Sequence, residues 1–221
     1  DLYEHFRSLC RDVFLYDMGP PQSPGNGARA IRGFICSRFV ADWLLSQGVA
    51  KGEKSAAAMR LPRWIMESRD EVSMASALQP FFDGEGHVCL SADSKRASVT
   101  VVQARHTDLD FVILPRRPGW RGTARTLSAG LLARSQVYGI DAPTFCGALN
   151  RSEVLDDAST LLRRLGFNPR LRLSSMYLKD DGLWSAHWAL SIGTRESARL
   201  GELGILTQSR KVARLRPART I

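Results

Sequence analysis

Leu78-Gln79-Pro80-Phe81-Phe82-Asp83-Gly84-Glu85-Gly86 is the stretch that decides the fold of this 221-residue chain. It closes an apolar, helix-like pattern over residues 71–83, after which the two glycines break the helix. Residues 87–90 have the composition of a strand. We therefore expect the Glu85 carboxylate at the C-terminal end of a helix, where the chain turns into a sheet.

This nonapeptide resembles the LAGLIDADG motif of homing endonucleases, which often reads LRGLFDGEG. The resemblance continues on both sides of it, in segments 43–48, 51–55, 61–65, 157–167, 188–193, 203–205 and 211–215. It implies that the motif helix packs against a twin helix and that Glu85 is a ligand of Mg²⁺. The bound ion would activate water and stabilise the leaving oxygen of a phosphodiester. For Asp83 we expect a structural role at the end of the helix.

The fold class implied by the resemblance is α+β. We expect LAGLIDADG modules of the order αββαββα, each with an antiparallel sheet that forms a saddle and helices on its other face. Residues 1–66 would hold the C-terminal half of a first module plus a linker. Residues 67–221 would hold a second module with an insertion at about 95–143, which makes about one and a half modules in all.

The residue patterns outside the motif agree with this order of elements. Val154, Leu155, Ala158, Leu161 and Leu162 recur at helical spacing. Arg170–Leu178 alternates between polar and apolar residues, and a second strand follows the turn Asp180-Asp181-Gly182. Near the N-terminus we expect a helix over residues 1–14, a strand over 28–36 and a helix capped by Ser37.

The two ends of the chain carry matching residues, which is why we infer a repeat. Lys54 and Lys211 have the same spacing as Ile35 and Ile192. Basic residues near the scissile phosphates are a property of the family that the motif resembles, and they can stabilise charge there. Lys54 and Lys211 are therefore the candidates for this catalytic role, although either could be an ordinary solvated lysine.

Outward-facing residues of the expected strands are the candidates for contact with DNA. A two-stranded ribbon fits the major groove, where arginine can pair with guanine through two hydrogen bonds. For each single residue, a solvated surface charge is an equal alternative, so the hypothesis concerns the face as a whole. The candidates are Arg29 and Arg32 in the first module, Arg170, Arg172, Lys179, Ser185 and His187 in the second, and Lys95 and Arg96 in the insertion.

Composition favours a polyanionic partner without naming it. The chain has 31 Lys and Arg against 22 Asp and Glu, a net charge of +9, and such a surplus binds phosphates with release of counterions. Its 4 cysteines include no C-x-x-C pair, which argues against a zinc ribbon and a disulfide scaffold. No apolar run is long enough for a membrane span, so we expect an intracellular, reducing compartment.

Two departures from the motif keep more than one function open. Pro80 stands where a small residue usually lies, and proline inside a helix costs about 3 kcal/mol. Only one motif is visible, and the missing acid would belong to a fragment upstream of Asp1, to a second polypeptide, or to neither. The sequence thus predicts a site-specific, Mg²⁺-dependent DNA endonuclease. The alternative is a non-cleaving relative, such as an intron-splicing maturase that binds structured RNA or a structural subunit of a nucleoprotein complex.

Overall fold

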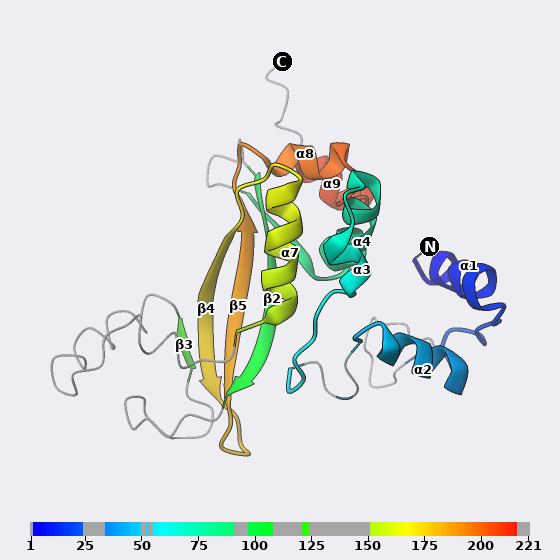
Figure 1. The fold of residues 1–221 in the computed structure, drawn as a ribbon. Helices are drawn as coiled ribbons and strands as arrows, with labels where there is room; N and C mark the ends of the chain where they lie inside the picture. The colour runs from blue at the N-terminus through cyan, green and yellow to red at the C-terminus, as the bar shows by residue number, and fades with distance from the viewer. Residues whose placement is uncertain are drawn as a thin grey trace, which may run out of the picture. The chain divides into compact units, whose positions relative to one another are not determined.

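The computed structural model describes residues 2–23, 34–49, 52, 55–90, 97–107, 121–123 and 151–215 (Figure 1). The chain divides into two compact units, Asp1–Gln47 and Gly48–Ile221. None of the helices within these residues is long and apolar enough to cross a bilayer.

The first unit contains two helices, α1 (Leu2–Phe14) and α2 (Arg38–Ser46). Ser37 caps α2 as predicted, because its hydroxyl accepts a hydrogen bond from the Val40 N–H at 3.4 Å. The two helices touch where the rings of Phe14 and Trp43 meet edge to face, 5.2 Å apart. Most of the strand predicted over residues 28–36 lies outside the described residues, and residues 34–36 form no strand.

The second unit is built on an antiparallel sheet with the strand order β1-β2-β5-β4-β3. Its strands are β1 (Gly86–Leu90), β2 (Ala97–Thr107), β3 (Arg121–Thr123), β4 (Arg170–Leu178) and β5 (Trp184–Ile192). Four of them carry the sheet, and β3 adds only a three-residue edge. The alternation of polar and apolar residues predicted β4 and β5, which pair in antiparallel register from Arg170 and Ser191 to Leu178 and Trp184.

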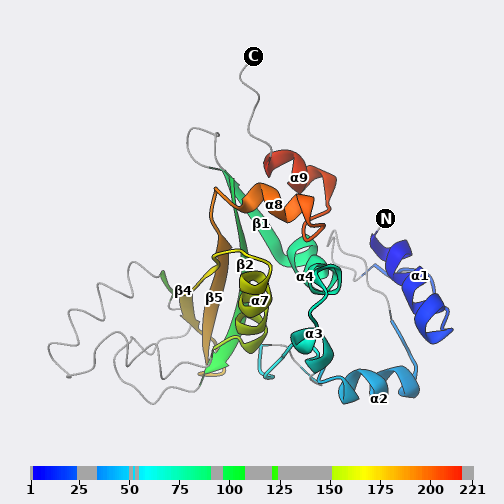
Figure 2. The same ribbon diagram turned by 45° about the horizontal axis from the view of Figure 1, so that its top comes forward.

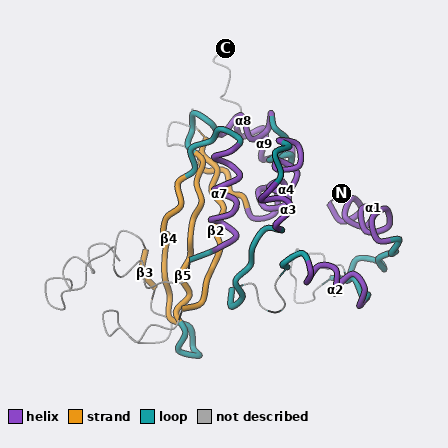
Figure 3. Tube along the Cα trace, in the orientation of Figure 1, coloured by secondary structure: helices purple, strands orange, loops and turns teal. Residues whose placement is uncertain are grey.

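The helices that the structure describes in this unit lie on one side of the sheet (Figures 1 and 2). They are α3 (Arg63–Glu67), α4 (Glu71–Glu85), α7 (Glu153–Arg164), α8 (Ser197–Glu202) and α9 (Ser209–Leu215). The Cα trace shows the same separation into a helical and a strand layer (Figure 3). The protein is therefore α+β, and α4, β1 and β2 are followed, after the short β3, by α7, β4, β5 and α8.

The core fills the space between the helices and one face of the sheet. The predicted apolar stripe of α7 is buried, and so is every second residue of β2 and β5. Phe82 and Leu78 of α4 reach the same core and are almost completely inaccessible. This packing leaves the opposite face of the sheet without a helix in the described part of the chain, and that face is where the functional candidates gather.

Helix α4 begins at Glu71 and therefore contains Pro80 in its interior. Asp70 caps it by accepting hydrogen bonds from the N–H groups of Val72 and Ser73 at 3.4 and 2.8 Å. Pro80 is exposed, so its ring adds to no core contact while its missing N–H removes one hydrogen bond of the helix.

The two glycines of the motif have different roles. Gly86 ends α4, and a Cβ atom at this position would collide with the carbonyl oxygen of Phe82. Gly84 lies within the helix, and a Cβ there would meet no neighbouring atom. Only Gly86 is therefore required by the turn into β1.

Candidate nucleic-acid interface

The face of the sheet that points away from the helices is here called the open face. Its side chains come from alternate positions of the strands, and the five strands contain no aspartate or glutamate. Described residues on this face are His87, Cys89, Ser98, Thr100, Val102, Ala104, His106, Arg121, Arg170, Arg172, Ser175, Tyr177, Ser185, His187, Ala189 and Ser191. Cations, hydroxyls and imidazoles without strand carboxylates make this surface suited to an anionic partner.

Three arginines gather at one end of the open face. Arg170 and Arg172 occupy alternate positions of β4, opposite Ser191 and Ala189 of β5, and both are exposed. Arg195 follows the end of β5 and is exposed as well. None of the three forms an ion pair with another residue in the described ranges, whereas half of the other described arginines do, so their charge is available for a ligand.

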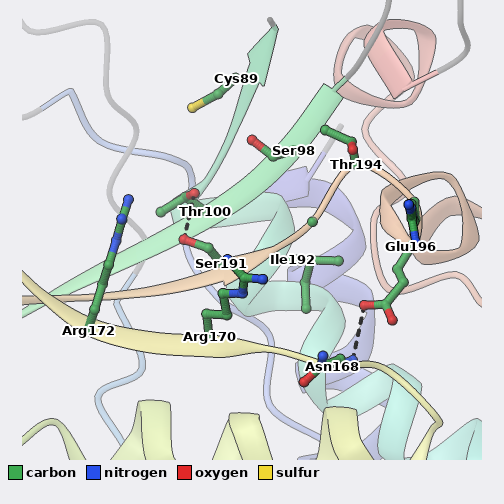
Figure 4. A pocket seen from close by; sticks show the side chains of 12 residues that line it. Cys89, Ser98, Thr100, Asn168, Arg170, Arg172, Ser191, Ile192, Thr194 and Glu196 are labelled. Carbon is green, nitrogen blue, oxygen red and sulfur yellow. Dashed lines mark hydrogen bonds between the residues drawn. The ribbon is translucent and has the colours of Figure 1, made fainter.

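These arginines surround a hollow of about 730 Å³. Its floor is polar, because the hydroxyls of Thr100 and Ser191 form a hydrogen bond of 3.1 Å across β2 and β5 (Figure 4). Glu196 is the one acid among the lining residues, and its carboxylate accepts a hydrogen bond of 3.0 Å from the Asn168 N–H. The lining consists of Cys89, Ser98, Thr100, Asn168, Arg170, Arg172, Ser191, Ile192, Gly193, Thr194, Arg195 and Glu196.

The other end of the open face is aromatic. The rings of Tyr177 and His187 meet edge to face with centroids 5.5 Å apart, and the Arg121 guanidinium lies 5.7 Å from the Tyr177 ring. Burial, and then the charge of Arg121, lower the pKa of His187 below its usual value of 6.5. Both effects disfavour the charged form of the imidazole.

An irregularity in β4 brings these two ends onto one face. Leu173 pairs with Trp188 and Ser175 pairs with His187, so Ser174 is an extra residue in the ladder. Such a bulge shifts the side-chain alternation by one position. Because of it, the even-numbered Arg170 and Arg172 share a face with the odd-numbered Tyr177.

The other residues predicted to contact DNA form an ion pair, are buried or lie outside the described residues. Lys179 follows β4 and forms an ion pair of 2.9 Å with Asp181. Ser185 lies on β5 but is 1% exposed, so its hydroxyl is not at the surface. Arg29, Arg32, Lys54, Lys95 and Arg96 lie outside the described residues.

Glu85 and Lys211 come together at the C-terminal end of α4. Glu85 is the last residue of the helix and is exposed. The Lys211 ammonium donates hydrogen bonds to the carbonyl oxygens of Phe82 and Asp83 at 3.2 and 2.6 Å. Burial lowers the pKa of Lys211. The charges of Asp83 and Glu85 raise this pKa and the charge of Arg210 lowers it, and the net effect is a decrease. Lys211 therefore caps the C-terminal end of α4, beside Glu85.

Asp83 has the structural role expected of it. It is 3% exposed, and its carboxylate accepts hydrogen bonds from the N–H groups of Thr207 and Gln208 at 2.9 and 3.1 Å and from the Thr207 hydroxyl at 2.6 Å. Burial raises the pKa of this carboxyl, but the hydrogen bonds from Thr207, Gln208 and Gln79 outweigh it and lower the pKa. Asp83 thus fastens the segment before α9 to the end of α4.

For Mg²⁺, the described residues supply one part of a site. They contain no group of three or more His, Cys, Asp and Glu side chains that could hold a metal ion. Mg²⁺ usually binds one or two carboxylates and completes its shell with water and substrate phosphates. An exposed Glu85 fits one of these carboxylate positions, and a second acid would have to face it.

Sequence reasoning missed Arg195, Arg210 and Arg214. Arg195 follows the turn Gly193-Thr194, and only the antiparallel register places it beside Arg170. Arg210 and Arg214 lie on one short helix, because residues Ser209–Leu215 form α9. The spacing of Arg210 and Arg214, four residues apart, was the available signal. Comparisons with protein-family models, curated proteins and solved structures give no match for this chain.

Proposed function

We propose that the open face binds double-stranded DNA and that the chain is a DNA endonuclease of the LAGLIDADG type. The observation that carries the proposal is a helix-free sheet face whose strands hold four arginines and no acid, three of those arginines on the face itself. Antiparallel strands can enter a major groove, and arginines that are not engaged in ion pairs can contact phosphates or guanine edges.

The order of the elements supports the assignment to this type. The described elements include, in chain order, α4, β1, β2, α7, β4, β5 and α8. This is the order αββαββα expected for one module, if the short β3 belongs to the insertion. The open face would be the saddle of that module. The half module expected before residue 67 has no comparable support, because residues 24–33 lie outside the described ranges.

Cleavage would take place at the C-terminal end of α4. There Glu85 offers its exposed carboxylate to the metal, while Lys211 holds a positive charge next to it. Mg²⁺, when bound, supplies an activated water and stabilises the leaving oxygen. The second carboxylate would come from a facing motif helix in another polypeptide or in an upstream fragment.

A second function, DNA or RNA binding without cleavage, is favoured by Pro80. Pro80 lies on the exposed side of α4, where the resemblance would place a small residue that lets a twin helix approach closely. A chain that cannot bring two such helices together would keep its open face but would lack a complete pair of acids.

Binding and cleavage can be tested separately. Arg170→Gln/Arg172→Gln should reduce affinity for a duplex of about 25 base pairs and lower the slope of log Kd against log salt by about 1 to 2, since each phosphate contact contributes about 0.9. The matched control is Arg69→Gln/Arg163→Gln, which removes two exposed arginines away from the sheet face. Equal slopes for the two double variants would refute the proposed interface.

Cleavage is measured on a plasmid library carrying random inserts, in the presence of Mg²⁺. The endonuclease predicts cutting by the wild-type chain and no cutting by Glu85→Gln, with unchanged duplex affinity. Absence of cutting by both proteins, together with salt-dependent binding, would favour the non-cleaving function. A structured RNA hairpin, tested in the same binding assay, shows whether RNA is the better partner.

A further inference from the structure

A second cationic hollow lies at the edge of the sheet, where β1 begins. Its volume is about 460 Å³, and its walls are formed by β1 and α9. It is lined by Gly86, His87, Val88, Arg210, Lys211 and Arg214. No acid is among these residues.

The positive charges of this hollow are crowded. Arg210 and Arg214 are exposed and lie four residues apart on α9, an arrangement in which like charges destabilise a helix. Neither forms an ion pair within the described part of the chain. Arg210 also contributes to the lowered pKa of Lys211. An anion bound between them would relieve this repulsion.

The hollow is also held in place by the interior of the protein. Asp83 binds the N–H groups of Thr207 and Gln208 immediately before α9, and Lys211 donates to two carbonyls of α4. The short helix is thereby attached at two points to the end of α4. A site positioned in this way loses little entropy when it takes up a ligand.

The register of the sheet joins this hollow to the first one. His87, which lines the α9 hollow, is paired across the strands with Thr100, which lines the hollow around Arg170. The neighbouring pair, Cys89 and Ser98, also lines the hollow around Arg170. The two cationic hollows are therefore neighbours across the pair β1–β2.

We propose that the α9 hollow binds a backbone phosphate of the same duplex that occupies the open face, with Arg210 and Arg214 as the contacting residues. This inference rests on the proposed function, since it extends the path of that duplex past the β1 edge. The duplex would then end its contacts beside Glu85, which precedes Gly86 in the chain.

The test is the salt dependence of binding to a duplex of about 25 base pairs by Arg210→Gln/Arg214→Gln, with Lys211 left intact. We expect the slope of log Kd against log salt to fall by about 0.9 to 1.8, one or two phosphate contacts. Combined with Arg170→Gln/Arg172→Gln, the two losses should add, because both sites bind one duplex. Arg210→Lys/Arg214→Lys retains the charges and should keep most of the slope, which separates a phosphate contact from a folding defect.

The outcomes distinguish this inference from the proposed function. If Arg170→Gln/Arg172→Gln lowers the slope while Arg210→Gln/Arg214→Gln matches Arg69→Gln/Arg163→Gln, the α9 hollow is no phosphate site and the open face stands. A wild-type chain without salt-dependent duplex binding overturns both. If Arg210→Gln/Arg214→Gln lowers the salt slope for an RNA hairpin but not for the DNA duplex, the assignment of the α9 hollow to duplex DNA is overturned.

Discussion

Single residues of the motif carry separate and opposite contributions to stability. Gly86 is required because the Phe82 carbonyl oxygen occupies the place of a Cβ, whereas Gly84 and Pro80 are exposed and weaken the helix they belong to. Within this one motif, Gly86 is thus required by the fold, whereas Gly84 and Pro80 lower the stability of α4. The costly ones lie on the exposed side of α4.

Substitution of the two glycines should separate these contributions. Gly86→Ala is expected to destabilise the fold by about 2–3 kcal/mol, since backbone has to move to admit the methyl group. Gly84→Ala should stabilise it by about 0.5–1 kcal/mol, because alanine loses less entropy in a helix. Urea unfolding monitored by circular dichroism measures both, and a loss of stability in Gly84→Ala would show that this position has a contact outside the described residues.

Pro80→Ala should stabilise the chain by about 1–3 kcal/mol. Alanine restores the missing N–H of the helix and removes the clash of the proline ring with the preceding turn. The measurement is the midpoint of urea unfolding at constant m-value. Unchanged stability would mean that α4 has fully adapted to the proline.

At the scale of elements, the connection of α4 to α9 depends on Asp83. In place of water, the buried Asp83 carboxylate accepts hydrogen bonds from two backbone N–H groups and one hydroxyl. Asp83→Asn should cost about 2–3 kcal/mol, since the amide turns a donor toward groups that are themselves donors. Hydrogen exchange of the amides in α9 is expected to accelerate more than that of α7, which Asp83 does not contact.

The pH dependence of stability follows from the same residue. The folded pKa of Asp83 lies below its ordinary value of 3.8, so the stabilisation is complete above about pH 4 and is lost as the pH falls through the folded value. The wild-type chain should therefore lose more stability between pH 5 and about pH 2.5 than Asp83→Asn. Parallel curves for the two proteins would contradict this assignment.

Most elements could be predicted because their side chains alternate or recur at a fixed period. The apolar stripe of α7 and the alternating residues of β5 are examples, and in both elements the period arises because one side packs against the core. The period does not define where an element begins: Ser152 precedes α7, but its side chain forms no capping hydrogen bond. Helix α9 was missed because three of its seven residues are basic and leave no clear apolar period, and its position depends on contacts with Asp83, far away in the sequence.

The candidate site was predictable only where it depends on local order. Glu85 at the end of a helix and Arg170 with Arg172 on one face follow from the sequence alone. The hollow around Arg170 does not, because Arg195, Thr100 and Ser191 meet through strand pairing. The burial of Ser185 could not be predicted either, because alternation shows which face of the strand a side chain lies on but not whether that side chain is exposed.

For the whole molecule, the proposed duplex binding should be linked to protonation of His187. Its pKa is lowered in the free protein, and a polyanion next to it would favour the charged form. Affinity for DNA is therefore expected to increase as the pH falls below about 6.5, and His187→Gln should weaken this dependence. Titration of the imidazole by NMR, with and without duplex, measures the shift directly. An identical pKa in both states would place His187 outside the interface.

The extra residue at Ser174 also determines how β4 can change. Leu173 before it and Met176 after it both face the core, with two serines between them instead of one. Removal of Ser174 would therefore restore a regular ladder and leave Met176, Tyr177 and Leu178 on their present sides. A deletion at Ser174 should thus be tolerated better than an insertion there, which would add a second extra residue, while the arginine end and the aromatic end can each vary by substitution without disturbing the other.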